Sequence, residues 1–209
     1  MCYSAESSIK SYMIGGISSL LLLTFKNSTA TFYGLFFFIV IQMQLIEYFL
    51  WNNQSCNWTN RFVSKFIPIE LALQVFILYL GAYLTNATII PKIYTYWGSI
   101  ISLIGVILIA FKEFLSYGHC TMANKSGSLK WDISDYNNFG LPYFGTFLIV
   151  LLSLKQYQIA IPIFLLGLLN RLYYVFYYNS TWESRWCYFS AYIPFFLVIY
   201  FLLKKTISM

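Results

Sequence analysis

Two glutamates stand inside long apolar stretches of the sequence, each with a glutamine about one helical turn away. Glu47 follows Gln44 by three residues, and Glu70 precedes Gln74 by four. On a helix these spacings place both members of a pair on one face. A carboxyl group inside a bilayer or a protein core is costly unless it is protonated, hydrated or paired. Both pairs are therefore candidate ligand-binding groups, and the carboxyls are alternatively candidate acid–base groups.

A basic residue, Arg171, stands in a later apolar stretch and is the best candidate partner for Glu70. At 1.5 Å per residue it lies about 10 Å from the end of its predicted helix, a depth similar to that of Glu70. We expect the two to form a buried ion pair, so that removing one partner alone destabilises the protein by about 3–5 kcal/mol. Lys10 and Lys112 are shallower, and we interpret them as side chains that reach back toward water.

Other common catalytic and metal-binding patterns are missing from the sequence. His119 is the only histidine, which excludes a histidine-rich metal site. The sequence contains no Cys-x-x-Cys, no phosphate-binding loop, no Gly-x-Ser-x-Gly and no His-Glu-x-x-His. We therefore expect neither a bound metal nor a cofactor.

The composition indicates which solvent surrounds these residues. Of the 209 residues, 59% are hydrophobic and 10% are charged, whereas a soluble domain is about one quarter charged. So few charges could not cover a globular surface in water, and lipid is the expected solvent. The formal net charge of +6 suits a membrane surface, and basic residues do not alternate with aromatics as in a nucleic-acid-binding face. We predict one polytopic membrane domain over residues 1–209, with the lipid bilayer as partner and no nucleic acid.

Seven apolar stretches approach or reach the length of about 20 residues that a helix needs to cross a bilayer. The predicted spans are 7–25, 31–51, 62–84, 94–115, 141–154, 159–177 and 186–203. Only residues 155–158 separate the fifth span from the sixth, which predicts a tight helical hairpin, with a re-entrant pair as the alternative. The expected fold class is an all-α integral membrane bundle of seven helices.

Seven spans place the two termini on opposite sides of the membrane. We call the side of the N-terminus side A; it also holds connections 52–61, 116–140 and 178–185. Side B holds three short connections and the C-terminus. All four cysteines fall on side A, whereas the connections and terminus of side B carry lysine alone as a charged residue. Because disulfides persist in oxidising compartments and short basic loops favour the cytosol, we predict that side A is lumenal or extracellular and the C-terminus cytosolic.

Four cysteines allow three connectivities, of which the helix order favours one. Cys2 and Cys187 lie at the starts of the first and seventh spans, which are neighbours if the helices close into a ring. This arrangement leaves Cys56 to pair with Cys120 and to tie the second connection to the long one. If side A were instead cytosolic, Cys2 would be a candidate for acylation.

The first five residues, Met1-Cys2-Tyr3-Ser4-Ala5, are the start of a set of motifs. The further motifs are Glu47, Cys56, Asn60, Gln74, and Trp131-Asp132 followed by Tyr136-Asn137. Together they resemble a family of uncharacterised small multi-pass membrane proteins, found in bacteria and large DNA viruses, that begin Met-Cys-Trp-Ser-Ala. Tyr3 replaces the tryptophan of that family, and Val75 follows Gln74 where a proline is expected. The resemblance singles out Cys2, Glu47, Cys56, Gln74 and Asp132 without supplying an activity.

The polar residues gather in the side-A half of the predicted bundle, which predicts a polar basin open to side A above an apolar plug. The leading hypothesis is a protein that binds or translocates a small polar solute in this basin. Its candidate ligand-binding residues are Gln44, Glu47, Glu70, Gln74, Arg171 and Asp132. One alternative is a membrane-embedded enzyme acting on a lipid, with Glu47 or Glu70 as acid or base and Asp132 or His119 reaching in. The other is a structural or assembly protein without ligand, whose charges fix helix register.

Overall fold

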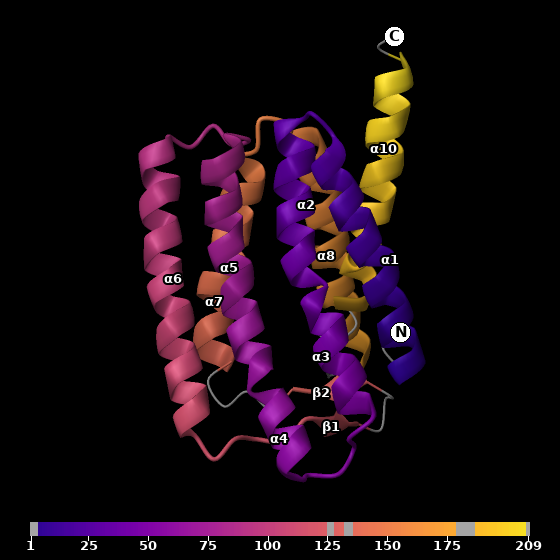
Figure 1. Ribbon diagram of the computed structural model, residues 1–209, viewed down its shortest axis with the longest axis vertical. Helices are drawn as coiled ribbons and strands as arrows, with labels where there is room; N and C mark the ends of the chain where they lie inside the picture. Colours follow the sequence, from indigo (N-terminus) through magenta and orange to yellow (C-terminus); the bar gives the residue numbers. More distant parts are fainter. Residues whose placement is uncertain (1–3, 125–127, 132–135, 179–186, 208–209) are drawn as a thin grey trace.

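The computed structural model describes residues 4–124, 128–131, 136–178 and 187–207, and its fold is all-α. The helices are α1 (Ala5–Thr24), α2 (Ser28–Val40), α3 (Gln42–Trp51), α4 (Trp58–Ser64), α5 (Phe66–Thr85), α6 (Lys92–Leu115), α7 (Tyr136–Leu152), α8 (Tyr157–Tyr178) and α10 (Ile193–Ile207). Two short strands, β1 (Met122–Ala123) and β2 (Leu129–Lys130), form an antiparallel hairpin. The long helices lie side by side in an elongated bundle (Figure 1).

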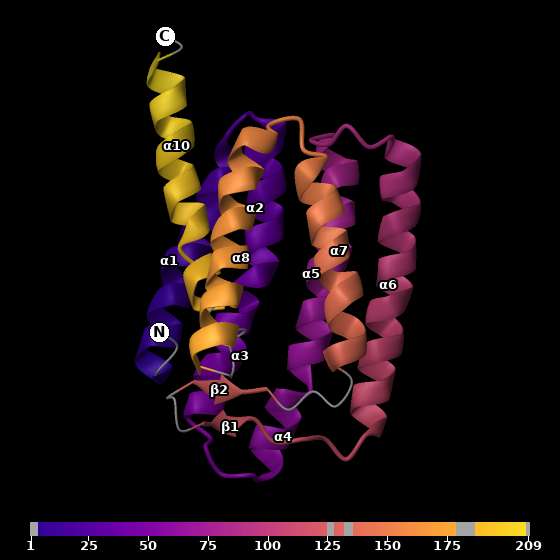
Figure 2. The same cartoon turned by 180° about the vertical axis from the view of Figure 1, so that it is seen from behind.

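The connections between helices fall at two opposite ends of the bundle. The start of α1, helix α4 and the β1–β2 hairpin lie at one end, side A, at the bottom of Figure 1. The α1–α2, α5–α6 and α7–α8 connections and the end of α10 lie at the other end, side B (Figure 2). Backbone hydrogen bonds from Ile89 N–H to the Ser153 carbonyl (2.7 Å) and from Lys155 N–H to the Ala87 carbonyl (2.8 Å) join two side-B connections. The sequence assigned these connections to the same two sides.

Two of the predicted spans are each divided into two helices. The α4–α5 break falls at Lys65, three residues before Pro68, because a proline has no N–H to donate to the carbonyl of Ser64. The α2–α3 break falls at Ile41, whose carbonyl accepts a tight-turn hydrogen bond from Gln44 N–H (2.9 Å). Hydropathy alone predicted each span as continuous, and only the first break has a sequence signal.

The predicted fifth and sixth spans form a helical hairpin. Helices α7 and α8 have 17 and 22 residues, pack against each other and run antiparallel (Figure 2). This arrangement is the expected helical hairpin, and whether the hairpin crosses the membrane or is re-entrant stays a prediction. In the part of the chain that the structure describes, four helical stretches are long and apolar enough to cross a membrane: Ser28–Trp51, Trp58–Thr85, Lys92–Leu115 and Cys187–Lys204.

Helix α1 buries its small polar residues and exposes its large apolar ones. The buried face carries Ser8, Ser11, Gly15, Ser18, Ser19 and Leu22. The exposed face carries Met13, Ile14, Ile17, Leu20, Leu21 and Leu23. The small residues allow α1 to approach α2, α3 and α10 closely, as helices do in membranes. A helix on the surface of a soluble protein has the opposite polarity.

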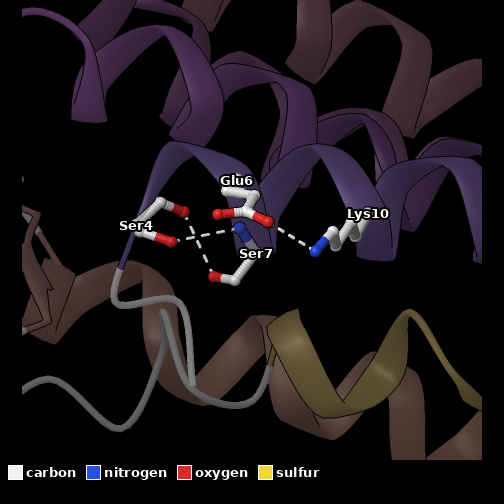
Figure 3. Close-up of polar contacts among 4 residues, drawn as sticks. All are labelled: Ser4, Glu6, Ser7 and Lys10. Atoms are coloured by element: carbon white, nitrogen blue, oxygen red, sulfur yellow. Dashed lines mark hydrogen bonds and ion pairs between the residues drawn. The ribbon is translucent and has the colours of Figure 1, made fainter.

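The start of α1 is fixed by local polar contacts (Figure 3). Ser4 is the N-cap, and its hydroxyl oxygen accepts a hydrogen bond from Ser7 N–H (3.1 Å). One turn on, Lys10 forms an exposed ion pair with Glu6 (Figure 3). Lys10 therefore lies at the surface, outside the buried interior, as the sequence interpretation of this lysine requires.

A small apolar cluster of Ile69, Ala72 and Val106 packs α5 against α6. Two further apolar clusters fill the bundle, one toward each side. The larger, which we call the side-B cluster, includes Phe32, Phe36, Leu78, Leu154 and Phe201. The smaller, the side-A cluster, consists of Met43, Leu50, Ile67, Leu71, Leu129 and Cys187, with Trp131 and Tyr143 packed against it. Because Leu129 belongs to β2, the long connection at side A contributes to the interior. Buried polar residues are interleaved with the side-A cluster: Glu47 stands between Met43 and Leu50 on α3, and Glu70 between Ile67 and Leu71 on α5.

Gly15 is required where α1 meets the segment that precedes α10. A Cβ at Gly15 would lie 2.4 Å from the Ala191 carbonyl oxygen, whereas a Cβ at Gly16 would meet only a methyl group of Ile41 at 3.7 Å. We expect Gly15→Ala to destabilise the protein by about 1–3 kcal/mol, since a backbone carbonyl must move. The matched control Gly16→Ala should be neutral or slightly stabilising. Thermal unfolding of both purified variants in detergent checks this, and equal midpoints would contradict the close approach.

Candidate functional site

Six polar side chains from four helices lie in the bundle interior at the depth of the side-A cluster, and we call them the polar layer. Its members are Ser11 on α1, Gln44 and Glu47 on α3, Glu70 and Gln74 on α5, and Tyr143 on α7. All except Tyr143 are almost completely buried. Buried polar groups need hydrogen-bond partners, and most partners in this layer come from within it.

The α1–α3 half of the polar layer is a short hydrogen-bonded chain. The Ser11 hydroxyl donates to Gln44 Oε1 (2.8 Å), and Gln44 Nε2 donates to Glu47 Oε2 (3.3 Å). The close approach of α1 that its small residues permit brings Ser11 within reach. The amide of Gln44 thus links a hydroxyl on one helix to a carboxyl on its own helix.

The α5–α7 half repeats the same arrangement with different helices. Gln74 Nε2 donates to Glu70 Oε2 at 2.6 Å, and the Tyr143 hydroxyl donates to Gln74 Oε1. The Tyr143 ring is held by Phe147, one turn further along α7, with ring centroids 4.6 Å apart. In each half a glutamine therefore receives one hydrogen bond from a hydroxyl and passes another to a carboxyl.

The two buried carboxyls lie on α3 and α5, which pack against each other. Glu70 Oε1 is buried and accepts no hydrogen bond from any residue that the structure describes. Two carboxylates cannot both remain charged in such a site without a counter-charge or a proton. The polar layer can therefore hold a proton, a cation or a donor-rich polar molecule at its carboxyl oxygens.

The structure brings together four of the six predicted ligand-binding residues. Gln44, Glu47, Glu70 and Gln74 all lie in the polar layer. Arg171 lies on α8, where its side chain is outside the described part, so its pairing with Glu70 stays a prediction. Asp132 also lies outside the described residues.

One of the two predicted disulfides is present. Cys56 and Cys120 are bonded, with their Cα atoms 5.5 Å apart, which joins the α3–α4 connection to the long connection at side A. Cys2 lies outside the described residues, so the Cys2–Cys187 pairing stays a prediction. Its premise holds, because α1 packs against α10. Cys187 is buried in the side-A cluster.

Sequence reasoning missed two members of the polar layer, Ser11 and Tyr143. Ser11 had a usable signal, since it stands four residues before Gly15 and shares its small-residue face. Tyr143 had none, because nothing in the sequence distinguishes it among 19 tyrosines. Asn60 entered only through the family resemblance, and the structure places it fully buried beside the disulfide-linked loop.

Comparison of the chain with protein-family models, curated proteins and solved structures finds no match.

Proposed function

We propose that this chain is a multi-pass membrane protein with seven spans. The inverted polarity of α1 supports this proposal, and so does the outer face of α6. Large apolar residues cover that face along its length: Ile93, Trp97, Ile101, Ile104, Leu108, Phe111 and Leu115. Soluble monomers rarely expose a continuous apolar surface of this kind. In the proposed topology side A, with its disulfide, is lumenal or extracellular, and side B, with Lys26, Lys92, Lys155 and Lys204, is cytosolic.

We further propose that the protein binds or translocates a small polar solute at the polar layer. The observation that carries this proposal is the pair of buried carboxyls, Glu47 and Glu70, each positioned by a glutamine. Carboxyl oxygens accept hydrogen bonds and favour positive charge, so the solute should carry hydrogen-bond donors. A core that needed only packing would not retain two acids in its interior.

Access from side A fits the distribution of the apolar clusters. The side-B cluster closes the interior with stacked aromatic rings, including Phe32 against Phe36. The side-A cluster is smaller, and part of it belongs to the connection that carries β2. In the conformation described here the glutamates are buried, so a solute would enter when that connection moves. The polar basin expected from the sequence would then open to side A only when this cover is displaced.

Ligand-dependent stability provides the test. Thermal unfolding of the purified protein is measured with millimolar methylammonium chloride, with formamide as a neutral donor and with sodium chloride as the salt control. A ligand at 100 times its dissociation constant stabilises a protein by about 2.7 kcal/mol. We expect stabilisation by methylammonium or formamide in the wild type and in Gln42→Ala, which alters an α3 glutamine outside the polar layer.

The Glu47→Gln/Glu70→Gln double variant separates this function from the structural alternative. It keeps the size and hydrogen bonding of both side chains but removes both carboxyls. We expect it to fold, with a lower unfolding midpoint if Arg171 pairs with Glu70 as predicted, and to lose the ligand-dependent stabilisation. If it retains the full response, or if neither probe stabilises the wild type, the carboxyls are not a solute site.

A further inference from the structure

A surface groove lies at side A, on the opposite face of α4 from the buried Asn60. Its volume is about 450 Å³. The lining residues are Cys56, Asn57, Trp58, Arg61, Phe62, Lys65, Ser116 and Tyr117. They come from the α3–α4 connection, from α4 and its C-cap, and from the connection that follows α6, and none of them belongs to the polar layer.

Two cations stand one helical turn apart in this groove without an acid among its lining residues. The Arg61 guanidinium lies over the Tyr117 ring, 4.4 Å from its centroid. Lys65 Nζ donates to the Ser116 carbonyl (2.7 Å). A guanidinium has five N–H donors and an ammonium has three, so these contacts leave donors available.

The loop that faces the two cations is held close by a glycine. Gly118 has a φ of +82°, which favours glycine, and a Cβ there would lie 3.0 Å from Lys65 Cε. This turn keeps Tyr117 and the Ser116 carbonyl against α4. Both cations therefore contact the same loop, Arg61 through the Tyr117 ring and Lys65 through the Ser116 carbonyl.

An aromatic track leads from the groove along the outer surface of α5 and α6. Trp58 stacks on Phe62 (5.2 Å between ring centroids), Phe62 contacts Phe66 (5.3 Å), and Phe66 contacts Phe114 (6.0 Å). Trp58 is 75% exposed and Phe114 is 51% exposed. Exposed aromatic rings beside cations are typical of the membrane–water interface.

We propose that this groove binds the phosphate headgroup of an anionic phospholipid, whose acyl chains lie along Phe62, Phe66 and Phe114. Arg61 and Lys65 supply charge-assisted hydrogen bonds to phosphate oxygens. The aromatic track continues from the cations onto the apolar face of α6. The acyl chains of a lipid would contact this face, whereas a free phosphate ion would not. The inference rests on the proposed membrane setting but not on solute binding at the polar layer.

Lipid binding is measured by native mass spectrometry of the detergent-purified protein, titrated with phosphatidylglycerol or phosphatidylcholine. The Arg61→Gln/Lys65→Gln double variant should bind phosphatidylglycerol about tenfold more weakly than the wild type. Lys92→Gln is the matched control, because Lys92 also lies near a tyrosine ring, that of Tyr83 at 5.8 Å, but at side B. It should bind phosphatidylglycerol as the wild type does.

Two further variants identify the source of the phosphate and guard against misfolding. Arg61→Lys/Lys65→Arg keeps both charges and should keep most of the binding. Phe114→Ala should weaken phosphatidylglycerol but leave inorganic phosphate, measured by calorimetry, unaffected. Equal phosphatidylglycerol affinity in the wild type and the neutral double variant would overturn the proposal. Binding of inorganic phosphate as tight as that of the lipid would replace it with a soluble-anion site.

Discussion

Removing the Cys56–Cys120 disulfide is expected to lower the free energy of unfolding by about 2–4 kcal/mol. The two cysteines are 64 residues apart in sequence, and the loop between them contains α4, α5 and α6. Closing a loop of that length removes many conformations from the unfolded chain. Helices that persist in detergent or lipid already restrict the conformations of the unfolded state. The expected loss of stability is therefore smaller than the value for closing such a loop in a fully flexible chain.

The measurement uses the double variant Cys56→Ser/Cys120→Ser, so that no lone thiol is left to form a wrong bond. Its unfolding is compared with that of the wild type without reductant and then with dithiothreitol. The wild type should lose stability on reduction. In the double variant any remaining effect of reductant would come from the predicted Cys2–Cys187 bond, and peptide mapping would identify it. A double variant as stable as the oxidised wild type would contradict the expected contribution.

This disulfide also shows which structural features could be predicted from the sequence. Sorting the cysteines by side required only the approximate positions of the spans, and those were correct to within a few residues at most helix ends. The pairing also required that the first and last helices be neighbours. The sequence suggested this only on the assumption that the helices close into a ring. The packing of α1 against α10 supplies that relation.

The candidate site was predictable within each helix but not between helices. The spacing of Glu47 from Gln44, and of Glu70 from Gln74, fixes a shared face and predicts the observed hydrogen bonds. Which helices then meet depends on side-chain packing, which spacing does not encode. Ser11 and Tyr143 were missed for that reason, and the partner assigned to Glu70 stays a prediction.

Some helix breaks have a cause in the local sequence and could be predicted, whereas others do not. Pro68 removes a backbone donor, so the interruption at Lys65 follows from one residue. Pro194 stands likewise in the first turn of α10, after the helical turn at Cys187–Ser190. The interruption at Ile41 has no such residue, and it depends on how α2 and α3 pack against the rest of the bundle.

Asn60→Leu is expected to destabilise the protein by about 2–5 kcal/mol, although the two side chains have similar sizes. The Asn60 side chain is fully buried and donates to the carbonyls of Asn53 (2.6 Å) and Thr121 (2.8 Å). Its Oδ1 accepts from Thr121 N–H (3.0 Å). Leucine would leave these backbone groups buried with fewer partners, at about 1–3 kcal/mol each. Thr121 N–H keeps a second contact with Ser64 Oγ (3.2 Å), which limits the loss.

Two other asparagine variants separate hydrogen bonding from volume. Asn60→Asp keeps the shape and the acceptor but places a second oxygen against two carbonyls, so it should be destabilised as strongly as the leucine variant. Asn52→Leu is the control, because Asn52 is exposed at the end of α3 and its side-chain amide donates to the Tyr48 carbonyl of that helix; it should change stability by less than about 0.5 kcal/mol. Thermal unfolding of all three checks this, and a tolerated Asn60→Asp would mean that only volume matters.

The effects of Asn60 and the disulfide should not add. Thr121, which Asn60 holds, follows Cys120 directly, so both contacts fix the same loop to the same end of the bundle. Groups that share a structural unit show coupling energies of about 0.5–3 kcal/mol. Once the loop is released in the Cys56→Ser/Cys120→Ser background, it can expose its carbonyls to water, and Asn60→Leu should then cost less than in the wild type. Strict additivity in this double-mutant cycle would show that the loop is held at two independent points.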